Sequence, residues 1–196
     1  MKLLHLKSFA ILSILLAASP NSNATNAGDQ TETQKVKIDD ISLTVPKSWK
    51  KSQPTSRLRK AQFLLPGEKN SNVKTEFVVY FFGGAGGGVD ANLKRWIGQF
   101  SAKGRSSKMF SGVSSQGKYW LVDISGTYQK PIGPPIRGKK VAVPNARMLA
   151  VILEVKGKGN YFFKLGGSQK TIDKAAKAFR ASFGGDSEKE KPYKLE

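Results

Sequence analysis

Catalytic chemistry in this 196-residue chain would depend on carboxylates or on a Ser–Lys pair. Its only histidine, His5, lies in a segment that we expect to be removed, and the chain contains no cysteine. Histidine has the unperturbed pKa nearest neutrality and the thiolate is a strong nucleophile, so acid–base relays, Cys–His pairs and ordinary zinc sites lack their usual residues. No spacing singles out a Ser–Lys pair. We therefore predict no catalytic, cofactor-binding or metal-ligating residue.

Asp123 is the carboxylate whose position suggests a perturbed pKa, because it lies within an apolar segment and would face inward with Leu121 and Ser125. With a second carboxylate it could support metal-independent hydrolysis, in which one group acts as acid and the other as base. A buried ion pair or an edge position also explains Asp123, and this is the interpretation we prefer. A metal-independent extracytoplasmic hydrolase, using carboxylates or Ser–Lys, is the alternative function.

A glycine-rich run, Gly83-Gly84-Ala85-Gly86-Gly87-Gly88, lies between an expected strand and an expected helix, where phosphates dock in other proteins. Its spacing does not match a dinucleotide fingerprint, because counting from Gly84 places Val89 at the third glycine position. It also lacks the Gly-Lys-Ser/Thr of a phosphate loop, and Asp90 adds a negative charge. We expect a flexible or closely packed connection and no nucleotide.

Basic residues far outnumber acidic ones, with 33 Lys and Arg against 14 Asp and Glu and a net charge of +19 at pH 7. Asp123 is the only acid in residues 91–153, and residues 47–60 contain basic residues and no acid. Such a surface attracts polyanions, so an acidic protein, a polysaccharide or an anionic membrane surface is the expected partner. Solubility alone is the alternative explanation.

The proline-rich stretch 129–146 is the best binding candidate, and we expect it to form a long loop. It has no aromatic residue, which together with export argues against nucleic acid as the partner. A solvated excursion without a function is the alternative. The predicted polyanion-binding residues are Lys130, Arg137, Lys139 and Lys140.

Residues 1–24 are expected to be a signal peptide, since Lys2 and Lys7 precede an apolar run that is followed by small residues. The run of about ten residues is too short to cross a bilayer, which needs about twenty helical residues. Cleavage could fall after Ala24 or after Ala27. We expect a secreted or periplasmic protein without a transmembrane segment, whose oligomeric state the sequence does not indicate.

Alternating apolar residues predict strands that surround two amphipathic helices. The helices are expected over residues 90–103, capped by Asp90, and 168–183, ending at Gly184. Trp49 is expected to lie in the core. The predicted strands are 36–38, 41–45, 57–65, 73–82, 108–115, 118–128, 147–155 and 161–165, with 73–82 central in its sheet. A helix is the alternative for residues 57–65.

This order of elements, with short links, favours an α+β fold over a parallel doubly wound sheet. We expect one domain over residues 36–185, in which two main helices pack on an antiparallel sheet. Residues 25–35 should be a flexible leader, and the charged residues 186–196 a disordered tail.

The segment Ile41-Ser-Leu-Thr-Val-Pro46-Lys-Ser-Trp49, a strand that runs into Pro-x-x-Trp, resembles the start of PsbP-like domains, named for an extrinsic photosystem protein. The closing strand hairpin and long helix over residues 147–183 are similar as well. The resemblance covers residues 36–183 and implies an α/β/α sandwich that serves as a partner-binding accessory module, without implying any site residue. Residues 81–100 and 161–165 also resemble a group of uncharacterised bacterial secreted proteins.

Overall fold

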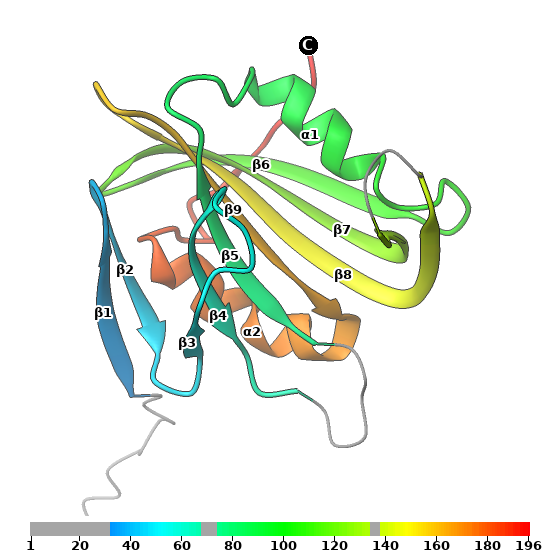
Figure 1. Ribbon diagram of the computed structural model, residues 1–196. Helices are drawn as coiled ribbons and strands as arrows, with labels where there is room; N and C mark the ends of the chain where they lie inside the picture. Colours follow the sequence, from blue (N-terminus) through cyan, green and yellow to red (C-terminus); the bar gives the residue numbers. More distant parts are fainter. Residues whose placement is uncertain (1–31, 68–73, 134–137) are drawn as a thin grey trace, which may run out of the picture. The chain divides into compact units, whose positions relative to one another are not determined.

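Antiparallel strands dominate the computed structural model, which describes residues 32–67, 74–133 and 138–196 (Figure 1). A two-stranded sheet pairs β1 (Thr33–Ile38) with β2 (Ile41–Pro46). The other strands form one sheet in the order β10-β6-β7-β8-β9-β5-β4-β3. Its strands are β3 (Lys50–Ser52), β4 (Arg59–Leu64), β5 (Glu76–Phe81), β6 (Ser106–Ser114), β7 (Gly117–Pro131), β8 (Lys140–Val155), β9 (Gly159–Ser168) and β10 (Lys191–Pro192).

The two helices, α1 (Val89–Ile97) and α2 (Gln169–Ser182), pack on opposite faces of the large sheet (Figure 1). Leu121 of β7 lies in the apolar cluster that contains Phe179 of α2, whereas its neighbour Val122 lies in the cluster that contains Trp96 of α1. Successive residues of a strand point to opposite faces, so these two clusters fill the two sides of the sheet. The predicted α+β fold with two main helices on an antiparallel sheet is confirmed.

The opening hairpin and the aromatic strand match their predictions. Residues Ile38 and Ile41 pair across the turn between β1 and β2. β5 lies between β9 and β4, and its Phe77 and Val78 are buried on alternate faces, as expected of a strand covered on both sides. Trp49 is 4% exposed, so its prediction as a core residue is also confirmed.

The proline-rich stretch 129–146 is not a long loop, and this prediction was wrong. β7 continues to Pro131 and β8 begins at Lys140, so the two strands form a long hairpin in which Lys130 pairs with Val141. Pro144 lies beside a register shift, where Asn145 has a φ of 53°. On the N-terminal side of Ala146, β8 does not pair with β9, and a strand edge tolerates the missing N–H group of proline.

The terminal segments are more ordered than expected. Residues 33–35, assigned to a flexible leader, belong to β1, while residues 1–31, including the predicted signal peptide, lie outside the described residues. The predicted disordered tail is also wrong: β10 pairs with β6, and the backbone N–H of Tyr193 donates to the carbonyl oxygen of Met109 at 2.9 Å. The carboxylate of Glu190 meets Arg180 of α2, which gives this charged segment a partner inside the fold.

Asp90 does not cap α1, contrary to the prediction. Gly88 is the N-cap residue and makes no side-chain cap, while Asp90 lies in the first turn. Its carboxylate instead accepts hydrogen bonds from the hydroxyl of Tyr193 and from the backbone N–H of Glu196, each at 2.7 Å. These bonds, that of Tyr193 first, lower the pKa of Asp90 and attach the C-terminal segment to the helix.

α1 is also shorter than predicted, because Phe100 forms a β-bridge with Tyr128 instead of continuing the helix. Among the described residues, neither helix is long and apolar enough to cross a bilayer.

Candidate functional site

The far end of the β7–β8 hairpin gathers three of the four predicted polyanion-binding residues. Lys130, Lys139 and Lys140 are exposed, and Arg137 lies outside the described residues. The backbone N–H of Ile132 donates to the carbonyl oxygen of Lys139 at 3.0 Å, which ties the two strands together here. We call Lys130, Ile132, Lys139, Lys140 and Val141 the hairpin tip.

The hairpin tip follows residues 127–129 of β7, which we call the arm and which contact the segment after α1. The backbone N–H of Gln129 donates to the carbonyl oxygen of Gln99 at 2.8 Å, and that of Ser101 donates to Thr127 at 2.9 Å. The rings of Phe100 and Tyr128 lie 5.3 Å apart at the same place. The segment that follows α1 therefore fixes the direction of the arm and, with it, the position of the lysines.

The three lysines of the hairpin tip have no ion pair among the described residues, unlike several other lysines. Lys60 pairs with Asp39 at 2.9 Å, and Lys47 pairs with Glu32 at 3.1 Å. The second basic region, residues 47–60, is thus partly neutralised by acids elsewhere in the chain. The positive charge of the hairpin tip is not neutralised by an ion pair within the described part of the chain.

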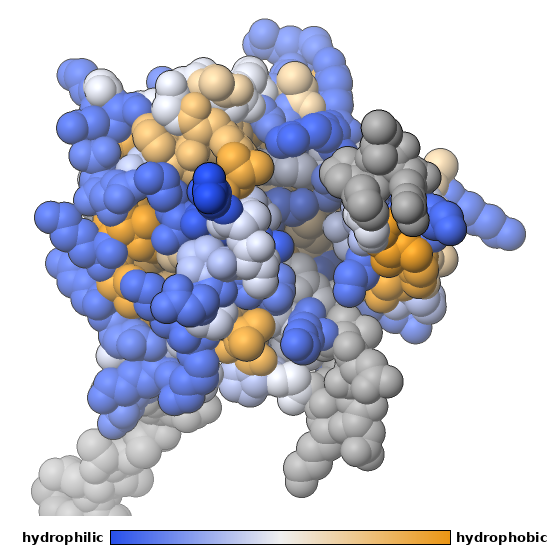
Figure 2. All heavy atoms as spheres, in the orientation of Figure 1, coloured by the Kyte–Doolittle hydropathy of each residue, from blue (hydrophilic) through white to orange (hydrophobic). Residues whose placement is uncertain are grey.

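Apolar side chains lie among these cations. Ile132 is 42% exposed and Val141 is 47% exposed, although both are aliphatic. Figure 2 shows apolar and hydrophilic surface side by side at the end of the molecule where the hairpin lies in Figure 1. A partner of the hairpin tip can therefore gain from burying apolar area as well as from charge.

Asp123 is engaged in an ion pair, which was the preferred interpretation. Arg147 of β8 donates from Nε to one carboxylate oxygen at 2.9 Å and from Nη2 to the other at 2.6 Å, and it also pairs with Asp173 of α2. These hydrogen bonds, those to Asp123 first, raise the pKa of Arg147 above its usual value. Both oxygens of Asp123 already accept hydrogen bonds, so this carboxylate does not favour the hydrolase alternative.

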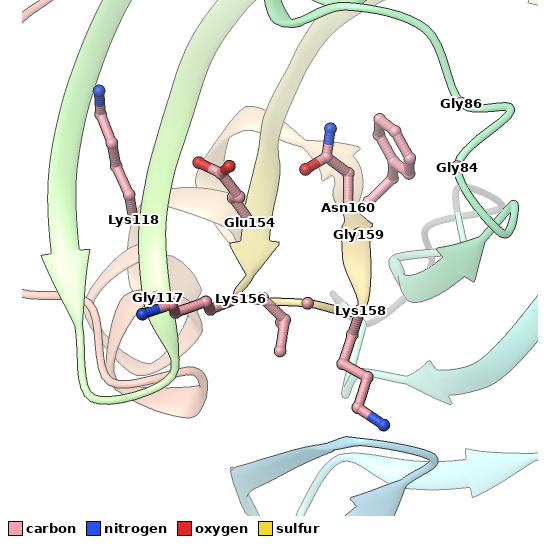
Figure 3. A pocket seen from close by; sticks show the side chains of 12 residues that line it. Gly84, Gly86, Gly117, Lys118, Glu154, Lys156, Lys158, Gly159 and Asn160 are labelled. Atoms are coloured by element: carbon pink, nitrogen blue, oxygen red, sulfur yellow. The ribbon is translucent and has the colours of Figure 1, made fainter.

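The glycine run borders a cavity of about 530 Å³ together with the turn between β8 and β9 (Figure 3). Glu154 and Asn160 point to the same side of this turn, whereas Lys158 points toward β1 and β2, where it pairs with Asp40 at 3.1 Å. Lys118 lies over the ring of Trp120, 4.6 Å from its centroid. The lysines of this cavity do not converge on one point.

Close packing explains one glycine of the run. A Cβ atom at Gly86 would lie 2.4 Å from the ring of Phe162, so a side chain here would displace that ring. The amide of Asn92 donates to the carbonyl oxygens of Gly86 and Gly88 at 2.8 and 2.9 Å, which holds the run against α1. The run acts as the closely packed connection in this part, and whether it binds a ligand stays untested.

A polar cluster that the sequence did not predict lies on the α1 side of the sheet, centred on Lys164. Two signals were present: a lysine within the otherwise apolar Tyr161-Phe-Phe-Lys-Leu165, and Gln62 within the buried part of β4. Neither shows which residues lie opposite, because that depends on strand register. In the described part of the chain, no three His, Cys, Asp or Glu side chains are grouped to hold a metal ion.

The comparisons with known proteins found similarity to solved structures but no matching family model or curated protein. Among solved structures, the chain is similar to a cyanobacterial PsbP, CyanoP from Synechocystis sp. PCC 6803, with 12% identity and a TM-score of 0.47. The match covers 89% of this chain and 100% of that chain.

This neighbour carries the family name that residues 41–49 suggested, whereas the comparisons give no support to the second resemblance, to bacterial secreted proteins. A likeness of this extent says nothing about what the chain binds.

Proposed function

We propose that this protein is an exported, non-catalytic binding or accessory protein that contacts an anionic partner or surface through the hairpin tip. The observation that carries the proposal is the exposure of Lys130, Lys139 and Lys140 on a braced arm, without an ion pair among the described residues. Export is supported by the character of residues 1–24.

The surroundings of the hairpin tip strengthen the case for an anion. Asp123 is the only acid in residues 91–153, and Arg147 already neutralises it. No other carboxylate of residues 91–153 is therefore left to compete for the lysines, and their field extends over a Debye length, about 8 Å at physiological ionic strength. Because the arm is held by backbone hydrogen bonds, little conformational freedom is lost when a partner binds.

A polyanion column tests the proposal, with immobilised heparin as the probe and the salt needed for elution as the readout. We expect Lys139→Glu/Lys140→Glu to elute at clearly lower salt than the wild type. The slope of log affinity against log salt should become less steep by about 2 or more. Both side chains are exposed, so the fold should be unaffected.

The matched control is Lys50→Glu/Lys51→Glu on β3, which makes the same change of charge at two exposed residues far from the hairpin in the sheet order. This control should change retention less than the hairpin variant does. Equal losses in the two variants would show that overall charge and not the hairpin tip binds the column. Retention that does not respond to salt would contradict anion binding altogether.

A further inference from the structure

Lys164 of β9 lies at the border between the apolar and the polar part of one sheet face. The register places Gln62 of β4, Val78 of β5, Lys164 and Ala150 of β8 side by side in one row across the sheet. Ala150 belongs to the apolar cluster beneath α1, whereas Gln62 belongs to a hydrogen-bonded polar group. The partly buried Lys164 therefore meets apolar surface on one side and polar groups on the other.

The ammonium of Lys164 lacks a negative partner among the described residues. Its Nζ donates to the side-chain oxygen of Gln99, which follows α1, at 2.9 Å. Burial first, and then the positive charges of Arg95 and Arg59, lower the pKa of Lys164 to about 8. Two other cations thus lie close enough to repel this ammonium.

Among the described residues of this cluster, the one carboxylate is that of Glu76, and it already has partners. Arg59 donates from Nη1 to the side-chain oxygen of Gln62 at 2.6 Å and to Glu76 at 3.3 Å. The amide of Gln62 donates to the other oxygen of Glu76 at 3.4 Å. This acidic group pairs with Arg59 and not with Lys164. Arg95 is exposed, and its guanidinium donates to the side-chain oxygen of Asn92.

Two tyrosines border the same cluster. Burial raises the pKa of Tyr80 on β5, whose hydroxyl also interacts with Arg59. Burial likewise raises the pKa of Tyr128 on the β7 arm, with a smaller contribution from Tyr80. Both phenols are consequently neutral at physiological pH, so they add hydrogen-bond donors without adding negative charge.

We propose that Lys164, Arg95 and Arg59 form a binding site for a small oxyanion, a carboxylate or a phosphate group, with Gln99 and Tyr80 beside it. Burying a cation away from water is costly unless an opposite charge accompanies it, and an anion would also relieve the mutual repulsion of the three cations. Guanidinium and ammonium groups together suit oxyanions, the first by its planar fork of donors and the second as a point charge.

The site should respond to pH in a defined direction. An oxyanion binds the protonated ammonium, so binding should raise the pKa of Lys164 from about 8 toward its ordinary value. Affinity should fall as the pH rises through about 8. Among the described residues, the other groups near the ammonium are the guanidinium groups of Arg95 and Arg59 and the side-chain amide of Gln99.

The experiment measures the Nζ titration of Lys164 by NMR in the full-length protein, without a ligand, with inorganic phosphate and, separately, with citrate. We expect one or both anions to raise the pKa of Lys164, and the arm that responds identifies a phosphate or a carboxylate ligand. This measurement needs no substitution, so it does not depend on how a variant folds. If neither anion changes the pKa of Lys164 up to the highest concentration used, the proposal is overturned.

A calorimetric titration of Lys164→Met with the same anion provides the second readout. Methionine keeps an unbranched apolar stem and removes the charge, so binding should weaken by about tenfold or more. The control Lys177→Met removes one charge from an exposed residue of α2, on the other face of the sheet, and should leave this affinity unchanged. Equal weakening in the two variants would overturn the site at Lys164, while loss of heparin retention concerns the hairpin tip alone.

Discussion

Replacing Phe77 by alanine is expected to lower the free energy of unfolding by about 3 to 5 kcal/mol. The Phe77 ring is fully buried and is the centre of an aromatic cluster: its centroid lies 5.2 Å from that of Phe179, 5.5 Å from Phe63, 5.8 Å from Trp49 and 6.0 Å from Phe163. These neighbours come from α2, two other strands and the turn after β2, so they cannot all move inward to fill the space. Urea denaturation followed by tryptophan fluorescence measures the loss.

The control for this prediction is Val113→Ala on β6, where the side chain is 75% exposed. It should change the free energy of unfolding by no more than about 0.5 kcal/mol. A loss of less than about 1 kcal/mol for Phe77→Ala, close to that of a surface substitution, would mean that the ring does not hold the two layers together.

Replacing Glu190 by glutamine is expected to lower the free energy of unfolding by about 3 to 5 kcal/mol, because it leaves a buried cation without its counter-charge. The side chain of Glu190 is 2% exposed and that of Arg180 is 10% exposed. Arg180 donates from Nε and Nη2 to the two carboxylate oxygens at 2.9 and 3.1 Å, and the hydroxyl of Tyr119 donates to one of them at 3.3 Å. Thermal and urea unfolding measure the change.

Two further variants separate the buried charge from the general effect of substitution in this segment. Glu188→Gln alters an exposed neighbour and should have almost no effect. Arg180→Met/Glu190→Met removes both charges together and should recover much of the stability lost in Glu190→Gln. If Glu190→Gln is as stable as the wild type, the C-terminal segment does not pack against α2 as described.

The predicted ordered elements followed from local patterns. Alternation of apolar residues located the hairpin of β1 and β2, and the helical spacing of Leu93 and Trp96 located α1. These patterns reflect which side of an element is buried, and burial dominates the energetics of a cysteine-free domain. The antiparallel α+β class followed from the same patterns, because the links between strands are short.

The errors arose where a distant partner outweighs local composition. Charge predicted disorder after Asp186, but Arg180 supplies a counter-charge for Glu190 and β6 supplies a strand edge for β10. The proline content predicted a loop after Tyr128. Pro131 instead lies at the end of β7, and Pro144 lies at the register shift of β8, where a missing N–H group is tolerated. Composition describes what a segment prefers alone, whereas pairing depends on what lies beside it.

By itself, the sequence determined which segments alternate, which face of each predicted strand and helix is apolar, and that the chain has a single histidine and no cysteine. Only the tertiary structure decided which charges meet: Asp123 with Arg147, Glu190 with Arg180, and Lys164 near two cations with no ion-pair partner in the described part of the chain. The physical reason is that periodicity acts within a few residues, whereas the fate of a charge depends on strand register and on layers contributed by remote parts of the chain.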